Sequence, residues 1–233
     1  MNLITATAKF IGPAQTESGV RCMHLEIQNQ GAKALPVPIY LIPTRAAGDT
    51  FVIDAYEQGT TLLFTGRMYP SKSDHKMYIA PTTPLQTVPA NTLVNQVQAA
   101  GGVGFIAEQR REDLFGCGML CQAPAQKLMN FTWDDSVPLR LDAWGDDATR
   151  FRKFIYKGRQ IAIGGRLKYE CWPGKDGETR TAYKVQIRGG QYTFFGKNTP
   201  EKAAAAAKVE PPVRSAQETV IPQPVPKGDE IPF

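Results

Sequence analysis

Residues 156–169, YKGRQIAIGGRLKY, contain a regular alternation of residue types. The apolar residues Ile161, Ile163 and Leu167 alternate with residues that are small or basic, including Arg166. A period of two is typical of a β-strand that buries one face and leaves the other in solvent. The stretch therefore predicts a strand whose apolar face belongs to a protein core.

An amphipathic helix is predicted just ahead of this strand. Phe151, Phe154 and Ile155 are spaced by three and four residues, which places them on one helical face. Asp146 and Asp147 precede them, where the first turn of a helix needs a capping residue. This part of the chain therefore predicts a helix that is followed directly by a strand.

The same pattern occurs once before, in residues 56–69, YEQGTTLLFTGRMY. A shift of 99 residues aligns the glycines, the apolar alternation and one arginine of the two stretches. The matched pairs are Gly59 and Gly158, Leu62 and Ile161, Phe64 and Ile163, Gly66 and Gly165, Arg67 and Arg166, and Met68 and Leu167. Val52, Ala55 and Tyr56 repeat the helical spacing. We infer a duplicated small domain of about 85–90 residues.

Further alternating runs complete each copy. In the second copy they lie at 139–144 and 183–188, and PGKDG at 173–177 has the residues of a tight hairpin turn. The predicted order is three strands, a helix, a fourth strand, a hairpin and a fifth strand. This order is that of the OB-fold, a five-stranded barrel. We therefore predict a mainly β protein with two tandem OB-fold barrels, each with a helix between its third and fourth strands.

Composition divides the chain further. Residues 91–109 hold three glycines after a polar stretch, and we interpret them as a linker between a first domain at 1–90 and a second at 110–196. Residues 197–233 contain seven prolines and an alanine run, and their only aromatic residue is Phe233. Such a segment buries too little apolar surface to offset its ordering entropy, so we predict a disordered tail.

The residues that alternate with the core positions favour a nucleic-acid partner. In the second domain they combine cations, which neutralise phosphates, with tryptophans, whose rings stack on bases. The predicted contact residues are Arg140, Trp144, Arg166, Lys168, Trp172, Lys184 and Arg188. Every base has a π-face, so stacking favours binding without sequence preference. Structural packing is the alternative role for either tryptophan.

The two domains differ in charge. Residues 110–196 contain 15 basic and 10 acidic residues, whereas residues 1–90 contain 7 basic and 6 acidic residues and no tryptophan. In the first domain Tyr69, Tyr78 and Lys72 are candidates, although ordinary sheet surface is the preferred explanation of them. We expect the second domain to make the stronger contact, and the first to bind weakly or to serve in assembly.

Other classes of site find little support. The glycine-rich AAGGVG lacks the lysine of a phosphate-binding loop, and neither histidine belongs to a recognisable nucleophile constellation. Cys117 and Cys121 lack the further ligands that a zinc site needs, and small buried cysteines are the simpler interpretation. We predict no catalysis, no metal and no cofactor. No apolar run is long enough to span a membrane, and the cysteine usage suits a reducing, cytoplasmic location.

Residues 137–196 resemble the bacterial single-stranded DNA-binding protein family, and residues 1–90 resemble it only weakly. Trp144, directly before Gly145, and Trp172 stand where that family carries base-stacking aromatic residues. The last five residues, DEIPF, resemble the end of the family's tail, in which acids precede isoleucine, proline and phenylalanine.

The resemblance implies a protein that coats single-stranded DNA during replication, recombination and repair, without sequence preference or catalysis. It implies a homodimer with four OB domains and a nucleoid-associated location. It also implies that the tail recruits replication and repair proteins through Asp229, Glu230, Ile231, Pro232 and Phe233. Two alternatives remain: a primosome or assembly factor that binds mainly protein, and an RNA-binding chaperone.

Overall fold

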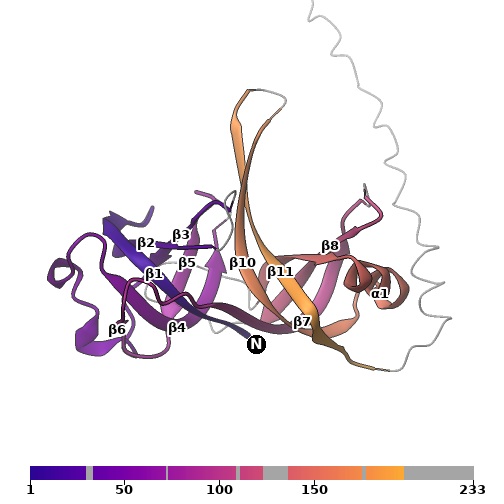
Figure 1. Cartoon of the computed structure of the whole chain (residues 1–233), viewed down its shortest axis with the longest axis horizontal. Helices are drawn as coiled ribbons and strands as arrows, with labels where there is room; N and C mark the ends of the chain where they lie inside the picture. The colour runs from indigo at the N-terminus through magenta and orange to yellow at the C-terminus, as the bar shows by residue number, and fades with distance from the viewer. Residues whose placement is uncertain (30–33, 72, 109–110, 123–135, 175–176, 197–233) are drawn as a thin grey trace, which may run out of the picture. The chain divides into compact units, whose positions relative to one another are not determined.

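Strands make up most of the chain in the computed structural model, which describes residues 1–29, 34–71, 73–108, 111–122, 136–174 and 177–196 (Figure 1). The strands are β1 (Asn2–Gln15), β2 (Arg21–Ile27), β3 (Val37–Leu41), β4 (Thr61–Pro70), β5 (Met77–Pro81), β6 (Gln86–Thr87), β7 (Asn95–Ile106), β8 (Leu114–Gln122), β9 (Ser136–Trp144), β10 (Gln160–Pro173) and β11 (Thr179–Phe194). The helical elements are the 3-10 turns η1 (Gly48–Thr50) and η2 (Ile53–Ala55) and the helix α1 (Asp146–Phe154). The predicted tail, 197–233, lies outside the described residues.

The described strands close into rings. The sheet runs in the order β10-β11-β9-β8-β7-β1-β2-β3-β5-β4-β6, and β1 also pairs with β4 while β7 pairs with β10. The first ring is therefore β1-β2-β3-β5-β4, and the second is β7-β8-β9-β11-β10. In each ring the third strand runs parallel to the last, as β3 does to β5 and β9 to β11. These pairings confirm a mainly β protein with a closed five-stranded barrel.

The alternation read from the sequence places the core correctly. Ile161, Ile163 and Leu167 are buried in the second ring, and their repeat partners Leu62 and Phe64 are buried in the first. Burying an aliphatic or aromatic side chain of this size contributes about 1.5–3 kcal/mol. The inward faces of the strands therefore hold each ring together, and the outward faces are left for contacts with other molecules.

Helix α1 lies between β9 and β10, as the spacing of its apolar residues predicts. It buries Ala148 and Phe151, and the Phe151 ring meets Tyr192 edge-on at a centroid distance of 4.9 Å. Its N-cap is Gly145, so the predicted capping role of the aspartates is wrong. Asp147 instead accepts a hydrogen bond of 2.9 Å from the Tyr192 hydroxyl, which fastens the helix to β11.

The helix predicted for the first ring does not form. The turns η1 and η2 occupy that place, and the extended backbone of Val52 separates them. The segment has β-branched residues and only one buried position within the turns, Ile53, so it has little apolar surface to stabilise a helix. The Tyr56 hydroxyl donates to the Thr50 carbonyl oxygen at 2.7 Å, which satisfies a backbone acceptor without a helix.

The segment interpreted as a linker is a strand over most of its length. Strand β7 pairs with β1, β8 and β10, and its Val97, Ala99 and Val103 are buried. Gly101 is required because a Cβ there would lie 2.0 Å from the Leu120 carbonyl oxygen of β8. Gly101, one of the glycines that suggest a flexible joint, therefore serves close packing of neighbouring backbones.

An asparagine closes each ring at the same place. In the first ring the buried Asn2 side chain donates to the Met68 carbonyl oxygen at 2.6 Å and accepts from the Met68 N–H at 3.1 Å. In the second, Asn95 makes the same pair of bonds with Leu167, both at 2.9 Å. Met68 and Leu167 are partners in the sequence repeat. The sequence repeat is thus matched by an asparagine in each ring, whose side-chain amide makes the two hydrogen bonds that a backbone amide of a neighbouring strand would make.

Replacing Asn2 by alanine tests this closure. The change leaves the N–H and carbonyl groups of Met68 buried without these partners, and each such group costs about 1–3 kcal/mol. We expect Asn2→Ala to lower the free energy of unfolding by roughly 2–4 kcal/mol, measured by urea denaturation. The exposed Asn91 gives the control, because Asn91→Ala should change stability by less than about 0.5 kcal/mol. Equal effects of the two substitutions would contradict the proposed role.

Candidate nucleic-acid interface

The outer face of β9, β10 and β11 carries most of the residues that the sequence singles out. Lys168 of β10 lies directly opposite Lys184 of β11, and Arg166 lies opposite Gln186. The Arg166 Nε donates to the Gln186 side-chain oxygen at 3.0 Å. Cross-strand neighbours on one face lie close together. The register therefore brings three of the predicted cations into one patch.

Trp144 lies at the end of β9 with its side chain partly open to solvent. The residue is 37% exposed, and the next residue, Gly145, has a φ of 58° that turns the chain out of the strand and into α1. The Arg111 guanidinium lies over the indole at 5.1 Å from the ring centroid. Two hydrogen bonds to Asp113, of 2.9 and 2.7 Å, hold that guanidinium. One part of the ring is thus fixed by protein and the rest is accessible.

A groove of about 350 Å³ lies beside Trp144. Strands β9, β10 and β11 supply most of its walls, and the segment ahead of β3 adds an apolar wall. We call it the Trp144 groove; it is lined by Ala34, Leu35, Asp142, Trp144, Lys168, Tyr169, Glu170, Cys171, Lys184 and Gln186. It places an aromatic ring and two ammonium groups around one space, which is a combination that suits a base and its phosphate.

Lys184 is already paired with acids in this groove. Its Nζ lies 2.7 Å from a Glu170 oxygen and 3.2 Å from an Asp142 oxygen. Burial acts to lower the pKa of Lys184, but the two carboxylates outweigh it and the pKa is raised. Burial raises the pKa of the Asp142 carboxyl despite the nearby ammonium. A phosphate entering the groove must therefore compete with Glu170 and Asp142 for Lys184.

The neighbouring Lys168 has no such ion pair among the described residues. Burial and the charge of Arg166 lower the pKa of the Lys168 ammonium. A group whose charge is disfavoured by its surroundings gains from an approaching anion. Lys168 is therefore the cation in the Trp144 groove that is most available to a phosphate.

Trp172 lies farther along β10, on the long hairpin that β10 and β11 form beyond the ring (Figure 1). It is 39% exposed and lies opposite Arg180 in the strand register. The predicted turn is confirmed, because Pro173 pairs with Thr179 and the Gly174 N–H donates to the Glu178 carbonyl oxygen. This tryptophan lies outside the Trp144 groove.

Two further predicted cations lie in other places. Arg140 on β9 is exposed and lies opposite Gly118 of β8, beside a separate cleft. Arg188 lies between the paired residues Ile187 and Tyr192 of β11, where the register with β10 shifts, and it lines a different hollow with residues of β7. The structure thus groups Trp144, Lys168 and Lys184, with Arg166 next to them, and separates Arg188 from that group.

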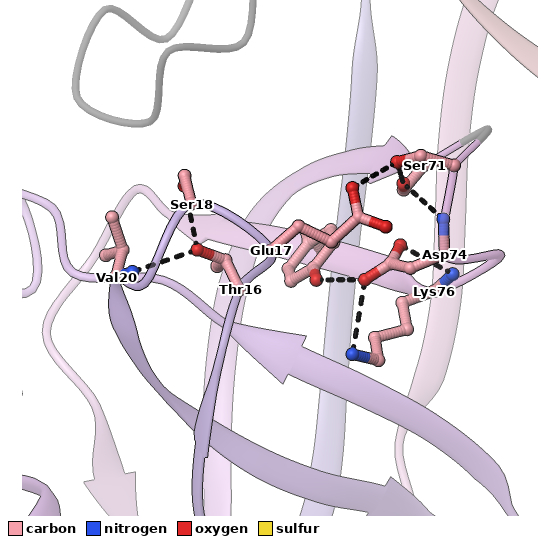
Figure 2. Close-up of polar contacts among 9 residues, drawn as sticks. Thr16, Glu17, Ser18, Val20, Ser71, Asp74 and Lys76 are labelled. Carbon is pink, nitrogen blue, oxygen red and sulfur yellow. Dashed lines mark hydrogen bonds and ion pairs between the residues drawn. The ribbon is translucent and has the colours of Figure 1, made fainter.

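The first ring presents acids at its loops. Figure 2 shows Glu17, from the turn after β1, close to the hairpin between β4 and β5. Glu17 accepts a 2.6 Å hydrogen bond from Ser73, and Asp74 lies 3.2 Å from the Lys76 ammonium. Asp74 is therefore already paired with a cation of this surface, Lys76. This arrangement agrees with the smaller positive charge of the first half.

The tyrosines considered in the first half are not surface groups. Tyr69 and Tyr78 are each 1% exposed, and Tyr78 donates its hydroxyl to Asp74 at 2.5 Å. Lys72 lies outside the described residues. An aromatic pair that was not predicted lies nearby, since His24 stacks on Tyr40 at 4.9 Å and Lys76 lies over the Tyr40 ring. Lys76, which covers the Tyr40 ring, is the same residue that pairs with Asp74.

Neither a metal site nor a membrane span is found in the part of the chain that the structure describes. No group of three or more His, Cys, Asp or Glu side chains there is placed to hold a metal ion. Cys117 and Cys121 are buried, and burial raises the pKa of their thiols to about 12 and about 11. No described helix has the length and apolar character that crossing a membrane requires.

Comparison with known proteins shows the fold. No protein-family model matches the sequence, and no curated protein matches it. Among similar solved structures, the wild-type single-stranded DNA binding protein from Thermus aquaticus has a TM-score of 0.55 and 14% identity, covering 85% of this chain and 95% of its own. A deletion mutant of that protein has a TM-score of 0.58 and 14% identity, covering 86% of this chain and 97% of its own. At this identity the similarity supports the fold alone.

Thiol labelling tests the burial of the cysteines and the exposure of the groove. Cys171 is exposed in the hairpin, whereas burial raises the pKa of the Cys22 thiol to about 11 and protects it. At about pH 8 we expect a chromogenic disulfide reagent to modify one thiol per native chain and all four after denaturation. Cys171→Ser should remove the native reaction. Rapid labelling of a second thiol in the folded protein would contradict this description.

Proposed function

We propose that this protein binds single-stranded DNA without sequence preference, through the outer face of its second ring. The observation that carries the proposal is the Trp144 groove, where a partly exposed indole shares one space with Lys168 and Lys184. Trp172 extends the stacking surface along the hairpin, and Arg140, Arg166 and Arg188 add positive charge beside it.

Each part of the groove has a chemical role in this proposal. A base stacks on the free part of Trp144, and such a contact is worth about 1–3 kcal/mol. A phosphate next to that base meets the ammonium of Lys168 and displaces the acids from Lys184. Counterions released from the phosphates make the affinity fall as salt rises. None of these contacts reads the edges of the bases, so the sequence of the strand is not read.

The known structures of similar fold support the proposal. The Thermus aquaticus proteins are single-stranded DNA binding proteins, and they share the architecture at low identity. We interpret the two rings as tandem OB-fold domains, with the division near β7, and the whole as a non-enzymatic binding protein of the cytoplasm. Its tasks would be DNA replication, recombination and repair.

We further propose that two chains associate to bring four rings together. Each chain already joins two rings through β7, so a homodimer is the smallest assembly with four. Light scattering with and without oligo-dT measures this directly. A mass of one chain at micromolar concentration would contradict the dimer and leave DNA binding as a separate question.

The sequence of the C-terminal end supports a second contact. Ile231, Pro232 and Phe233 are apolar, and Asp229 and Glu230 precede them. A short segment of this kind suits an apolar pocket with a basic rim on another protein. We propose that it recruits replication and repair proteins.

Substitution of the two tryptophans tests the DNA-binding face. We expect Trp144→Ala to weaken binding of a labelled oligo-dT about 5- to 100-fold, the equivalent of one lost stacking contact, and Trp172→Ala to weaken it further. Fluorescence anisotropy at fixed salt measures the dissociation constants. Trp144→Phe retains a π-face and should recover most of the affinity. A matched oligo-rU in the same titration decides between DNA and RNA.

Glu170→Gln provides a control of opposite sign. It removes a carboxylate that lies 2.7 Å from Lys184, so affinity for oligo-dT should rise about two- to fivefold. Loss of affinity in Trp144→Ala, with a gain in Glu170→Gln, cannot come from general destabilisation. If both tryptophan variants bind as tightly as the unmodified protein, the site is wrongly assigned.

Deletion of Phe233 tests the recruiting role of the C-terminal end. The shortened chain should lose binding to purified replication and repair proteins, because the apolar contact is removed, and keep its affinity for oligo-dT within about twofold. A pull-down on immobilised oligo-dT reports both properties. A matched variant, Gln223→Ala, changes a polar residue of the same segment and should recruit normally. Normal recruitment by the shortened chain would contradict the proposal.

A further inference from the structure

Phe105 is an exposed aromatic residue that lies outside the predicted site. It is 49% exposed on β7, just after a register shift between Val103 and Phe105. It lies within residues 91–109, which the sequence pattern predicts to be a linker. A single exposed apolar residue is common on protein surfaces, so the residues around Phe105 decide whether its ring has a binding role.

A glycine fixes the position of this ring. Phe105 lies opposite Gly118 of β8, and a Cβ at Gly118 would be 1.9 Å from the Phe105 Cε1 atom. The ring therefore occupies the space above that glycine and rests on the β8 backbone. Gly118 in turn lies opposite Arg140 of β9. The register thus places an aromatic ring and an arginine on either side of one glycine, on the same outer face as Trp144.

Phe105 lines a cleft of about 450 Å³ to which both halves of the chain contribute. Arg140 and Lys184 bring two cations from the second ring, and Met77 and His75 come from the β4–β5 hairpin of the first. All of the residues that line it are described, and none of them is acidic. A cleft with an aromatic ring, apolar walls and two cations is complementary to a nucleobase followed by a phosphate, although the phosphate must compete with Glu170 and Asp142 for Lys184.

The cleft shares one lining residue, Lys184, with the Trp144 groove, and Lys168 lies directly opposite Lys184 in the strand register. A strand that stacks one base on Trp144 and passes a phosphate over Lys184 therefore reaches Arg140 and Phe105 next. The hairpin between β4 and β5 then forms the far wall of its path.

We propose that Phe105 is a further base-stacking residue and that single-stranded DNA passes from the Trp144 groove across Lys184 into this cleft. The inference rests on the proposed function, and it adds a part of the DNA path to which the first ring contributes. It assigns a binding role to a residue and a cleft that the sequence pattern did not indicate.

Substitution of Phe105 in the full-length chain tests this path. Phe105→Ala should weaken binding of long oligo-dT about 5- to 100-fold, the fold-change of one stacking contact. Phe105→Tyr retains the π-face and should bind normally. Ile106→Ala is the matched control, since Ile106 is 43% exposed on the same strand but does not line the cleft, and its affinity should be unchanged.

The length of the DNA gives a second readout. In a series of oligo-dT lengths, the shortest strands occupy the Trp144 groove alone and should be insensitive to Phe105→Ala. Longer strands reach the cleft, and only these should lose affinity. A purely structural role of the ring would lower the melting temperature and weaken all lengths equally.

Photocrosslinking keeps the test valid if Phe105→Ala does not fold. An oligonucleotide that contains 5-iodouracil forms crosslinks with aromatic rings on which it stacks, and the unmodified protein should yield a crosslinked peptide containing Phe105. Tight binding without that crosslink, or an unchanged affinity of folded Phe105→Ala for every length, overturns the inference and leaves the proposed function intact. Failure of the unmodified protein to bind any oligo-dT overturns the proposed function itself.

Discussion

Strand β7 is the element on which the rest of the structure depends, because it pairs with β1, β8 and β10. It is the first strand of the second ring and at the same time an edge partner of the first. Its Asn95 ties Leu167 of β10 in the way that Asn2 ties Met68 in the first ring. The β10–β11 hairpin, and with it the Trp144 groove, is therefore positioned by a strand that both halves share.

The part of this fold that follows from periodicity was predictable. Alternation at Ile161 and Ile163 and the helical spacing around Phe151 give the strand and the helix of the second ring correctly. The matching spacing around Val52 does not give a helix, since spacing reports a face only where that face has a core to cover. The glycines of β7 were misinterpreted because a sequence does not reveal that the carbonyl of Leu120 approaches Gly101.

The sequence likewise predicts only a part of the candidate site. Alternation shows that Trp144, Lys168 and Lys184 face outward, and the structure brings them around one groove. Alternation does not show that Glu170 and Asp142 already form ion pairs with Lys184, because those contacts depend on the register between strands. Arg188 has the right residue type on the right strand, yet a shift in register places it in another hollow. Charge and aromatic content therefore indicate the kind of partner, while register decides which residues act together.

In the proposed function, bases stack on exposed tryptophans of the second ring. The most direct measurement is the intrinsic tryptophan fluorescence of the unmodified protein, titrated with oligo-dT and with an abasic strand of the same length and charge. Base stacking predicts strong saturable quenching by oligo-dT and weaker binding with little quenching by the abasic strand, because only the former offers bases to Trp144 and Trp172. Equal quenching and equal affinity for the two strands would show that phosphate contacts alone hold the DNA, and would contradict stacking on these tryptophans.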